Sequence, residues 1–365
     1  MMDTQKGGKY IGHGTTGCVF KSHLKCKDVN NIKNSIGKVF IDKAEYDEES
    51  RSVEIVKRID PNNEFTVPLL GKCDEVQYFR RTDNVASCKM IKENSQDPKT
   101  YKQLIYRYGG KSLETVMEGN GTLNSFWKIL TAFEPILKGI EKLTKESMVH
   151  LDIKPPNLLM LKDKLYLIDF GLLSSNVEVF KTNRQQILLD DYMWYPPEFK
   201  AYMSNNKGTI ETLLKRYLDN FEMGDALIRR GIKSILNSAN GKQQLEGFYN
   251  DKVSRKEYVQ FAPKVDVYSL GIVFAQLFVW SGYMRKVYSR PCQNSVLRDH
   301  IRTMIKGMLN CDPRNRSSIQ QVVVQYEKIM ELRKCLKRKT SSVKLSPSAQ
   351  QVKPKTKLNI CLSKM

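Results

Sequence analysis

Two short stretches of the chain carry side chains whose types and spacing could do chemistry. The first, residues 150–157, reads HLDIKPPN, so an amine follows a carboxylate by two residues and an amide follows it by five. The second, residues 169–171, reads DFG and comes directly after the strand-like run LYLI. Transfer of a phosphoryl group needs an acceptor for a hydroxyl proton, metal ligands that neutralise the charge of a triphosphate, and a cation near the migrating group. The two stretches contain residue types for all three tasks.

Both stretches resemble motifs of eukaryotic-type protein kinases, namely the catalytic loop H-x-D-x-K-x-x-N and the D-F-G motif. The resemblance implies that Asp152 takes the proton of the acceptor hydroxyl and that Lys154 is the cation beside the transferred group. It also implies that Asn157 and Asp169 bind Mg²⁺. Either carboxylate alone would be read as an ordinary surface residue. The full pattern, followed by DFG behind a hairpin with its turn at 162–164, argues against coincidence.

The resemblance covers about residues 9–332, apart from residues 72–100 and an insertion after Glu198. It implies an α+β fold with two lobes, a small β-rich N-lobe and a larger helical C-lobe, and ATP as the phosphoryl donor. We therefore expect the N-lobe at 1–108 and the C-lobe at 109–332, with an insertion at about 199–262. Residues 333–365 are rich in Lys, Ser and Pro and are expected to form a disordered basic tail.

A glycine-rich stretch near the N-terminus, residues 10–20, lies between two strand-like runs. It fits the pattern G-x-G-x-x-G-x-V with Gly12, Gly14, Gly17 and Val19. Glycine lets backbone amides approach phosphates without a clash at Cβ. A dinucleotide-binding turn would read similarly, but it needs a helix directly after the glycines and an acid about 20 residues further on. Here strand-like residues follow, and the resemblance makes Lys38 the lysine that holds the α- and β-phosphates of ATP.

In such kinases a glutamate on a helix holds this lysine, and residues 44–59 have helical periodicity. The apolar residues of the segment form a rough stripe, which consists of Tyr46, Val53, Val56 and Ile59. Glu49 falls on the same stripe. A carboxylate on an apolar face is costly unless it is paired, so Glu49 is expected to hold Lys38. The alternative is an exposed glutamate on a charged helix.

The strand-like residues 103–108 run into two glycines, and the resemblance makes this segment the hinge whose backbone meets adenine. Tyr106 would stand at the back of the adenine site, and Tyr108 would lie beside the nucleotide. Arg107 replaces an acidic residue that is common at this position, a change that backbone hydrogen bonding to adenine should tolerate.

Three further features resemble the parts that support a kinase active site. An apolar helical stripe over residues 126–143 leads to the catalytic loop and contains Pro135, which should kink the helix. Asp266 resembles the helix aspartate that anchors the loop. Glu198, in a Pro-Pro-Glu version of the A-P-E motif, should form a buried pair with Arg316.

The expected insertion has apolar stripes of its own within residues 210–236, and these stripes must be buried somewhere. Packing against the C-lobe is one interpretation. A docking surface for a partner protein is the other.

The chain carries a net charge of +21, and residues 333–365 hold ten Lys or Arg and no acid. The rest of the chain keeps a charge of +11 and is therefore basic in its own right. Such charge favours acidic protein substrates, or nucleic acid bound through the tail. The alternative is a solvated basic surface with no specific partner.

The longest apolar run, residues 270–280, is shorter than the ~20 residues that span a bilayer, so we expect no membrane partner. The eight cysteines are scattered without a C-x-x-C pair and are expected to be reduced thiols of a cytosolic protein. The glycine-rich loop and the insertion most resemble serine/threonine kinases of large DNA viruses. That resemblance implies the host cytoplasm or the virion as the location.

Lys154, two residues after the candidate base, favours serine and threonine hydroxyls as acceptors. Two residues depart from the family pattern. Asp191 or Tyr192 stands where serine/threonine kinases place a threonine, and Leu151 replaces the arginine that often pairs with an activation-loop phosphate.

Three other functions remain open beside an active protein kinase. A pseudokinase scaffold would lack a chemical group, yet all the positions for chemistry are filled. A small-molecule phosphotransferase of the same fold would generally lack Lys154, Glu198 and Asp266 in their peptide-binding context. A nucleic-acid binder is supported by charge alone.

Overall fold

The computed structural model describes residues 8–14, 16–76, 87–93, 101–180, 193–199, 243–244, 247–248, 255–282 and 293–342. The chain divides into two compact units. The first contains the residues up to Lys111 together with Leu159–Lys162 and Tyr166–Leu173, and the second contains the remainder.

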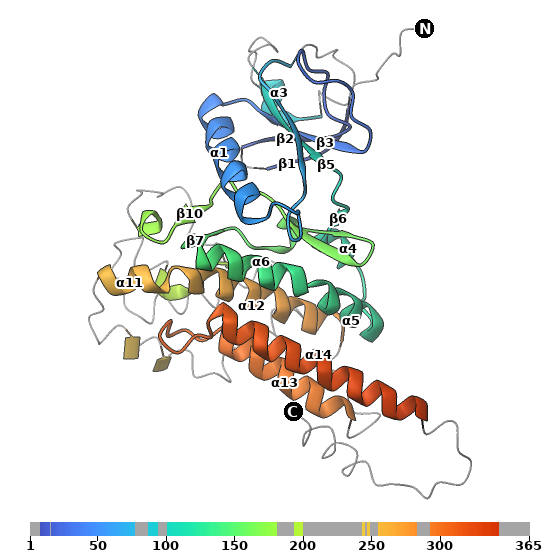
Figure 1. Ribbon diagram of the computed structural model, residues 1–365, viewed down its shortest axis with the longest axis vertical. Coiled ribbons are helices and arrows are strands. Elements are labelled where there is room, and N and C mark those ends of the chain that lie inside the picture. The colour runs from blue at the N-terminus through green and yellow to red at the C-terminus, as the bar shows by residue number, and fades with distance from the viewer. Residues whose placement is uncertain are drawn as a thin grey trace, which may run out of the picture. The chain divides into compact units, whose positions relative to one another are not determined.

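The first unit is built on a five-stranded sheet with the strand order β1-β2-β3-β5-β4 (Figure 1). Its strands are β1 (Lys9–His13), β2 (Gly17–Lys21), β3 (Ser35–Phe40), β4 (Leu69–Cys73) and β5 (Lys102–Arg107). All neighbouring strands are antiparallel. The central strand, β3, is the most buried of the five.

Helix α1 (Lys43–Ile59) lies beside this sheet (Figure 1). It begins after Asp42, whose carboxylate accepts hydrogen bonds from two backbone N–H groups of the first turn. Tyr46 and Val53 pack against apolar residues of the sheet. The helix predicted over residues 44–59 is therefore confirmed.

The cysteines described in the first unit are paired, which corrects the expectation of reduced thiols. Cys18 of β2 is bonded to Cys88, which precedes the short helix α3 (Lys89–Glu93), and Cys26 is bonded to Cys73 of β4. All four are buried in one apolar cluster. The partners are 70 and 47 residues apart in the chain, so no local motif indicated them. Because these cysteines are paired, cysteine usage no longer supports a cytosolic location.

The second unit is mainly helical. The helices in its described residues are α4 (Leu113–Val116), α5 (Leu123–Ala132), α6 (Glu134–Lys145), α11 (Arg255–Phe261), α12 (Pro263–Trp280), α13 (Gln293–Met308) and α14 (Ile319–Ser342). Helix α12 is buried along most of its length and packs with α13 and α14, and α14 also packs against α6 (Figure 1). One unit is thus β-rich and the other helical, which confirms the α+β fold expected for a kinase.

Short strands and turns flank the residues of the catalytic motifs. They are β6 (Lys111–Ser112), β7 (Met148–Val149), the 3₁₀ turn η2 (Pro155–Asn157), β8 (Leu158–Leu161), β9 (Lys164–Leu167), β10 (Ser174–Ser175) and the 3₁₀ turn η3 (Glu178–Phe180). β7 pairs with β10, and β6, β8 and β9 form a three-stranded sheet. The hairpin predicted with its turn at 162–164 is confirmed by β8 and β9.

Pro135 divides the apolar stripe that was expected to form one kinked helix. Helix α5 ends at Ala132, and α6 begins at Glu134 with the proline in its first turn. Proline has no N–H to donate, and the first turn is the part of a helix where that donor has no internal partner. The predicted kink is therefore a complete break, and both helices bury their apolar faces.

Helix α14 continues to residue 342, so the expectation of a disordered tail from residue 333 is wrong for its first ten residues. Arg333 donates to Oγ1 of Thr131 at 3.0 Å, and its guanidinium carbon lies 4.4 Å from the ring centroid of Trp127. A long basic side chain can cover apolar surface with its stem while its charge stays near water. Residues 343–365 of the expected tail lie outside the described residues.

Only the last part of the expected insertion falls on described residues. Phe248 is buried against the rings of Tyr258 and Phe261, and the guanidinium carbon of Arg314 lies 5.3 Å from its ring centroid. This part packs within the second unit. The apolar stripes predicted within 210–236 lie outside the described residues.

By length and composition, one stretch of the described chain, Glu257–Trp280, could cross a membrane. Most of it is buried inside the second unit, as is usual for the core helix of a helical domain.

We predict that the pairing of the cysteines can be read by chemical labelling. In protein denatured without a reductant and then alkylated, Cys18, Cys26, Cys73 and Cys88 should stay unmodified, whereas the free Cys311 should react. Peptide mapping by mass spectrometry would identify both sets.

Reduction should lower the free energy of unfolding by about 2–4 kcal/mol per bond, because it removes a constraint on the unfolded chain.

A sample reduced before alkylation is the control, because every cysteine should then react. Labelling of the four paired cysteines without reductant would contradict the pairing.

Candidate active site

The lysine predicted to bind phosphates lies in a cluster of ionised groups in the first unit. Lys38 is in β3, and its Nζ lies 2.5 Å from Oε2 of Glu49 in α1 and 3.0 Å from Oδ1 of Asp169. Lys38 and Glu49 are both buried. The pair predicted between them is confirmed, and the alternative of an exposed glutamate is wrong.

Two carboxylates keep the charge on Lys38. Burial alone would lower the pKa of the Lys38 ammonium, but Glu49 and Asp169 outweigh burial and raise this pKa above its ordinary value. The hydroxyl of Tyr106, in β5, donates to the other oxygen of Glu49 at 3.3 Å. Tyr106 was predicted at the back of the adenine site. In the structure it donates a hydrogen bond to Glu49, the glutamate that orients Lys38. The ammonium is thus charged and oriented, as phosphate binding requires.

The backbone around Asp169 is fixed by the loop that follows α1. Asp169 has a φ of +65°, a left-handed conformation that aspartate adopts more readily than most residues. Two residues earlier, Leu167 donates its N–H to the carbonyl oxygen of Phe65 at 2.8 Å. The carboxylate of Asp60 organises this loop by accepting hydrogen bonds from the backbone of residues 64–66 and from one side-chain hydroxyl. The sequence analysis missed Asp60, although an aspartate followed by Pro-Asn-Asn is a turn signal.

The three glycines of the predicted phosphate loop have different surroundings. A Cβ on Gly12 or Gly14 would meet no atom within 4 Å, so the backbone there has room for a phosphate. A Cβ on Gly17 would lie 2.2 Å from the carbonyl oxygen of Val39, so this glycine lets β2 approach β3 closely. Strand packing alone therefore accounts for the third glycine.

Val19 and Tyr108 were also predicted to contact the nucleotide. Val19 lies opposite Lys38 in the register of β2 and β3. Tyr108 follows β5 and donates its N–H to the carbonyl oxygen of Asn34 at 2.8 Å, while the ammonium of Lys21 lies 5.2 Å from its ring centroid. Because this N–H is already engaged, a purine at the hinge would have to use other backbone groups.

Asp152 is the centre of a hydrogen-bonded loop in the second unit. Its Oδ1 lies 2.8 Å from Nζ of Lys154, and its Oδ2 accepts from Nδ2 of Asn157 at 2.7 Å. The same Nδ2 donates to the backbone oxygen of Asp152 at 2.9 Å. The 3₁₀ turn at Pro155–Asn157 folds the chain back so that these groups meet. The structure thus brings together the three residues predicted for this loop.

Asp266, in α12, holds the backbone just before Asp152. Its Oδ2 accepts from the N–H of His150 at 2.7 Å, and its Oδ1 accepts from the N–H of Leu151 at 2.9 Å. Burial raises the pKa of Asp266, and the two backbone hydrogen bonds lower it. Burial is the larger effect, so the pKa is raised to about 7. The predicted anchoring contact is confirmed.

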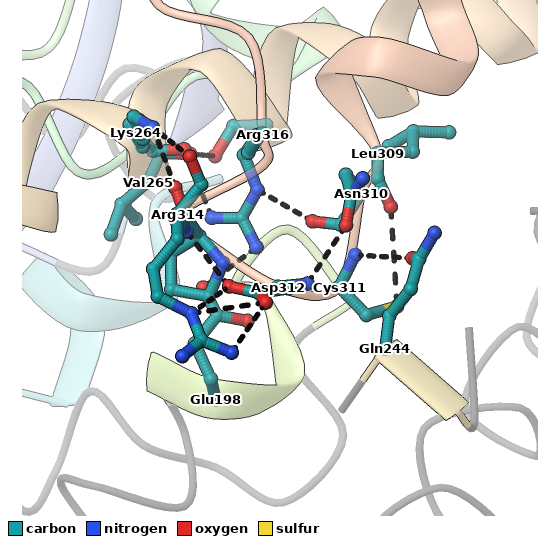
Figure 2. Close-up of polar contacts among 12 residues, drawn as sticks. Glu198, Gln244, Lys264, Val265, Leu309, Asn310, Cys311, Asp312, Arg314 and Arg316 are labelled. Atoms are coloured by element: carbon teal, nitrogen blue, oxygen red, sulfur yellow. Dashed lines mark hydrogen bonds and ion pairs between the residues drawn. The ribbon is translucent and has the colours of Figure 1, made fainter. Parts of the chain in front are cut away.

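Glu198 and Arg316 form the predicted buried ion pair of the second unit, with 2.7 Å between Oε1 of Glu198 and Nη2 of Arg316. Arg316 also donates to the backbone oxygens of Asn310 at 2.8 Å and Lys264 at 3.2 Å. Figure 2 shows how these groups gather around the Arg316 guanidinium. Because both charges are buried, removing either one would leave the other unpaired at a large cost in stability.

Asp169 and Asn157, the predicted metal ligands, each carry an oxygen of the kind that could bind a divalent cation. Asp169 offers a carboxylate. The amide nitrogen of Asn157 is used by Asp152, which leaves its amide oxygen as the group that could bind a metal. Mg²⁺ prefers oxygen ligands and in phosphoryl-transfer sites takes one or two carboxylates plus substrate phosphates. Within the described part of the chain, no group of three or more His, Cys, Asp or Glu could hold a metal by itself.

The sequence is similar to those of known proteins. The sequence model described as the protein kinase domain matches residues 6–207. Over 131 residues the chain is 25% identical to a probable serine/threonine-protein kinase, irlA, of Dictyostelium discoideum, a match that covers 35% of this chain and 9% of that protein. Over 64 residues it is 38% identical to mitogen-activated protein kinase kinase kinase 8 of Rattus norvegicus, which covers 18% of this chain and 13% of that protein. The chain thus spans a small part of the length of these relatives.

We predict that Asp266 makes stability depend on pH. An unfolded aspartate has a pKa of about 3.9, whereas burial raises the pKa of folded Asp266 to about 7. Between these values the folded state binds one more proton than the unfolded state. The stabilising contribution of this group is therefore complete below about pH 4 and is lost as the pH rises through about 7.

Asparagine does not titrate, so wild type should gain free energy of unfolding relative to Asp266→Asn as the pH falls from about 8 to about 5. Urea unfolding of both proteins across this range would measure the difference. The exposed Asp163→Asn is the control and should run parallel to wild type. A constant difference between wild type and Asp266→Asn would show that Asp266 has no raised pKa.

Proposed function

Because this chain belongs to the protein kinase family, whose domain matches more than half of it, we propose that it is an active enzyme that transfers the γ-phosphoryl group of ATP to serine or threonine hydroxyls of proteins. The observation that carries this proposal is the geometry of Asp152. One carboxylate oxygen lies beside the ammonium of Lys154, and the other is hydrogen-bonded to Asn157. A general base works best when it is held in one orientation, and these two contacts supply that restraint.

In the proposed reaction, the substrate hydroxyl oxygen attacks the γ-phosphorus, the bond to the bridging oxygen breaks, and ADP leaves. Asp152 accepts the proton of the hydroxyl. The ammonium of Lys154, 2.8 Å from Asp152, offsets negative charge on the group in transit. Lys38 binds the phosphates that ADP retains, and its raised pKa keeps it charged at neutral pH.

Mg²⁺, when bound with ATP, would neutralise charge on the β- and γ-phosphates. Asp169 and the amide oxygen of Asn157 are the groups that would hold it. Lys38 lies 3.0 Å from Asp169, so the same ammonium that binds phosphates also orients this carboxylate.

Serine and threonine are the proposed acceptors for two reasons. Lys154 follows the base by two residues, which in kinases of this kind favours aliphatic hydroxyls. In addition, one relative, the Dictyostelium discoideum protein, is named as a probable serine/threonine kinase.

A pseudokinase scaffold is the principal alternative. The absence of a residue needed for catalysis would support a scaffold. Here, however, each position that the chemistry requires holds a residue of the required type. Those residues are Lys38, Asp152, Asn157 and Asp169. A small-molecule phosphotransferase is less well supported, because the Glu198–Arg316 pair belongs to the segment that binds peptides in protein kinases.

The role of Asp152 predicts the result of Asp152→Asn. The variant should lose transfer to a protein substrate by at least about 100-fold, because it cannot accept the hydroxyl proton. Its affinity for ATP should stay nearly unchanged, because the base acts on the acceptor and not on the nucleotide. Radiolabelled-ATP transfer to casein, to a basic protein and to a small-molecule panel would measure the first, and equilibrium nucleotide binding the second.

Asp163→Asn removes an exposed carboxylate from the β8–β9 turn and should keep full activity. Near-normal transfer by Asp152→Asn would refute the assigned role. Wild-type protein that binds ATP but labels nothing would favour the scaffold, and label on small molecules alone would favour the other phosphotransferase.

We also predict that the enzyme is active without phosphorylation of its activation segment. Many kinases use an arginine before the catalytic aspartate to pair with an activation-loop phosphate, whereas here the position holds the uncharged and buried Leu151. Protein expressed with a phosphatase, and shown by mass to be unmodified over residues 171–198, should transfer within about tenfold of the untreated rate, or ~1.4 kcal/mol of barrier. Protein that is silent until a hydroxyl in this range is phosphorylated would contradict the prediction.

A further inference from the structure

Tyr195 makes a long-range contact with the catalytic loop that the sequence analysis did not anticipate. It precedes the Pro-Pro-Glu motif, and its side chain is 1% exposed. Its hydroxyl donates to the backbone oxygen of Leu151 at 2.8 Å, across 44 residues of chain. Leu151 is the residue directly before Asp152.

This contact fixes one end of the peptide unit that leads into Asp152. The carbonyl of Leu151 and the N–H of Asp152 belong to the same planar unit. The N–H of that unit donates to Nδ1 of His150 at 3.1 Å, while its carbonyl oxygen accepts from Tyr195. A plane held at both ends cannot rotate about its flanking Cα atoms, so the backbone direction at which Asp152 begins is set.

The conformation of Leu151 explains why the unit needs to be held. Leu151 has a φ of +65°, a left-handed conformation that costs a residue with a Cβ about 1–2 kcal/mol. Such conformations persist where the surrounding structure over-determines them. Here the N–H of Leu151 donates to Asp266 and its carbonyl accepts from Tyr195, so both backbone groups have a partner.

Tyr195 is itself held in place within the second unit. Its ring meets the edge of the Phe199 ring with 5.2 Å between centroids. The carbonyl of the preceding residue, Trp194, accepts from the hydroxyl of Ser269 at 2.8 Å. Three residues after Tyr195, Glu198 is paired with Arg316. The hydroxyl is therefore presented to the loop by an anchored segment.

We propose that Tyr195 is a positioning residue for phosphoryl transfer: its hydroxyl orients Asp152 through the carbonyl of Leu151. Serine/threonine kinases place a threonine hydroxyl near residues 191–192, and this chain has none there. The tyrosine hydroxyl restrains the loop from a different position and through the backbone. The inference rests on the proposed role of Asp152.

Tyr195→Phe tests the proposal, because it removes only the hydroxyl. Tyr326→Phe is a matched control: Tyr326 is also buried in the second unit, and its hydroxyl donates to the backbone oxygen of Leu130 at 3.0 Å. Both variants should lose comparable thermal stability. Tyr195→Phe should lower kcat at least fivefold, about 1 kcal/mol of barrier, with KM for ATP within about twofold of wild type. Tyr326→Phe should keep kcat within about twofold of wild type.

A kcat for Tyr195→Phe within about twofold of wild type would overturn the proposal, and so would equal losses of kcat in both variants, which would indicate a merely structural role. If Tyr195→Phe does not fold, Ser269→Ala removes the bond to the Trp194 carbonyl and should lower kcat at least twofold with KM for ATP unchanged. An unchanged kcat in that variant would then overturn the proposal.

A readout without activity separates this inference from the proposed function. Hydrogen exchange of the peptide that contains residues 150–157 should be faster in Tyr195→Phe than in wild type and unchanged in Tyr326→Phe. If the wild-type protein transfers no phosphoryl group, the proposed function is wrong. The hydrogen-exchange rates would still decide whether Tyr195 restrains the loop. Equal exchange in all three proteins would overturn the restraint.

Discussion

The catalytic loop depends on one buried carboxylate. Asp266 is the only charged residue among the buried residues of α12, and its carboxylate accepts hydrogen bonds from the backbone N–H groups of His150 and Leu151. Without that acceptor, two buried N–H groups would lack a partner, at a cost of about 1–3 kcal/mol each. Without those donors, the carboxylate would be buried and unsatisfied. The helix and the loop therefore stabilise each other, and the position of Asp152 follows from this contact.

The first unit applies the same principle to a cation. Lys38 can remain charged while buried because Glu49 and Asp169 surround it, and Tyr106 engages the oxygen of Glu49 that Lys38 does not use. A buried charge that loses its partner is strongly destabilising, so α1 and the strand that leads to Asp169 are tied together by this cluster. Charged groups held in advance can act on phosphates without reorganising at the moment of reaction.

The parts of the site that could be predicted are those that repeat locally or stand at fixed spacing. Glu49 was predictable because it falls on the apolar stripe of a helix and an acid there must be paired. Pro135 was predictable as a disturbance of the helix because proline removes a backbone donor, although the sequence indicated a kink and the structure has a break. Asp266 and Arg316 were predictable from motifs that resemble those of kinases, and each makes the contact expected of it.

The sequence by itself determined the residue types of the chemistry, the helix and strand periodicities near them, and the family. Tertiary structure decided which distant residues meet: Cys26 and Cys73 are 47 residues apart, and Tyr195 reaches Leu151 across 44. It also decided that Arg333 lies against the ring of Trp127 and that Gly17 allows β2 to lie close to β3. A local pattern reports only which face of an element is apolar. The partner of that face depends on how elements far apart in the chain are brought together, and no spacing along the chain encodes it.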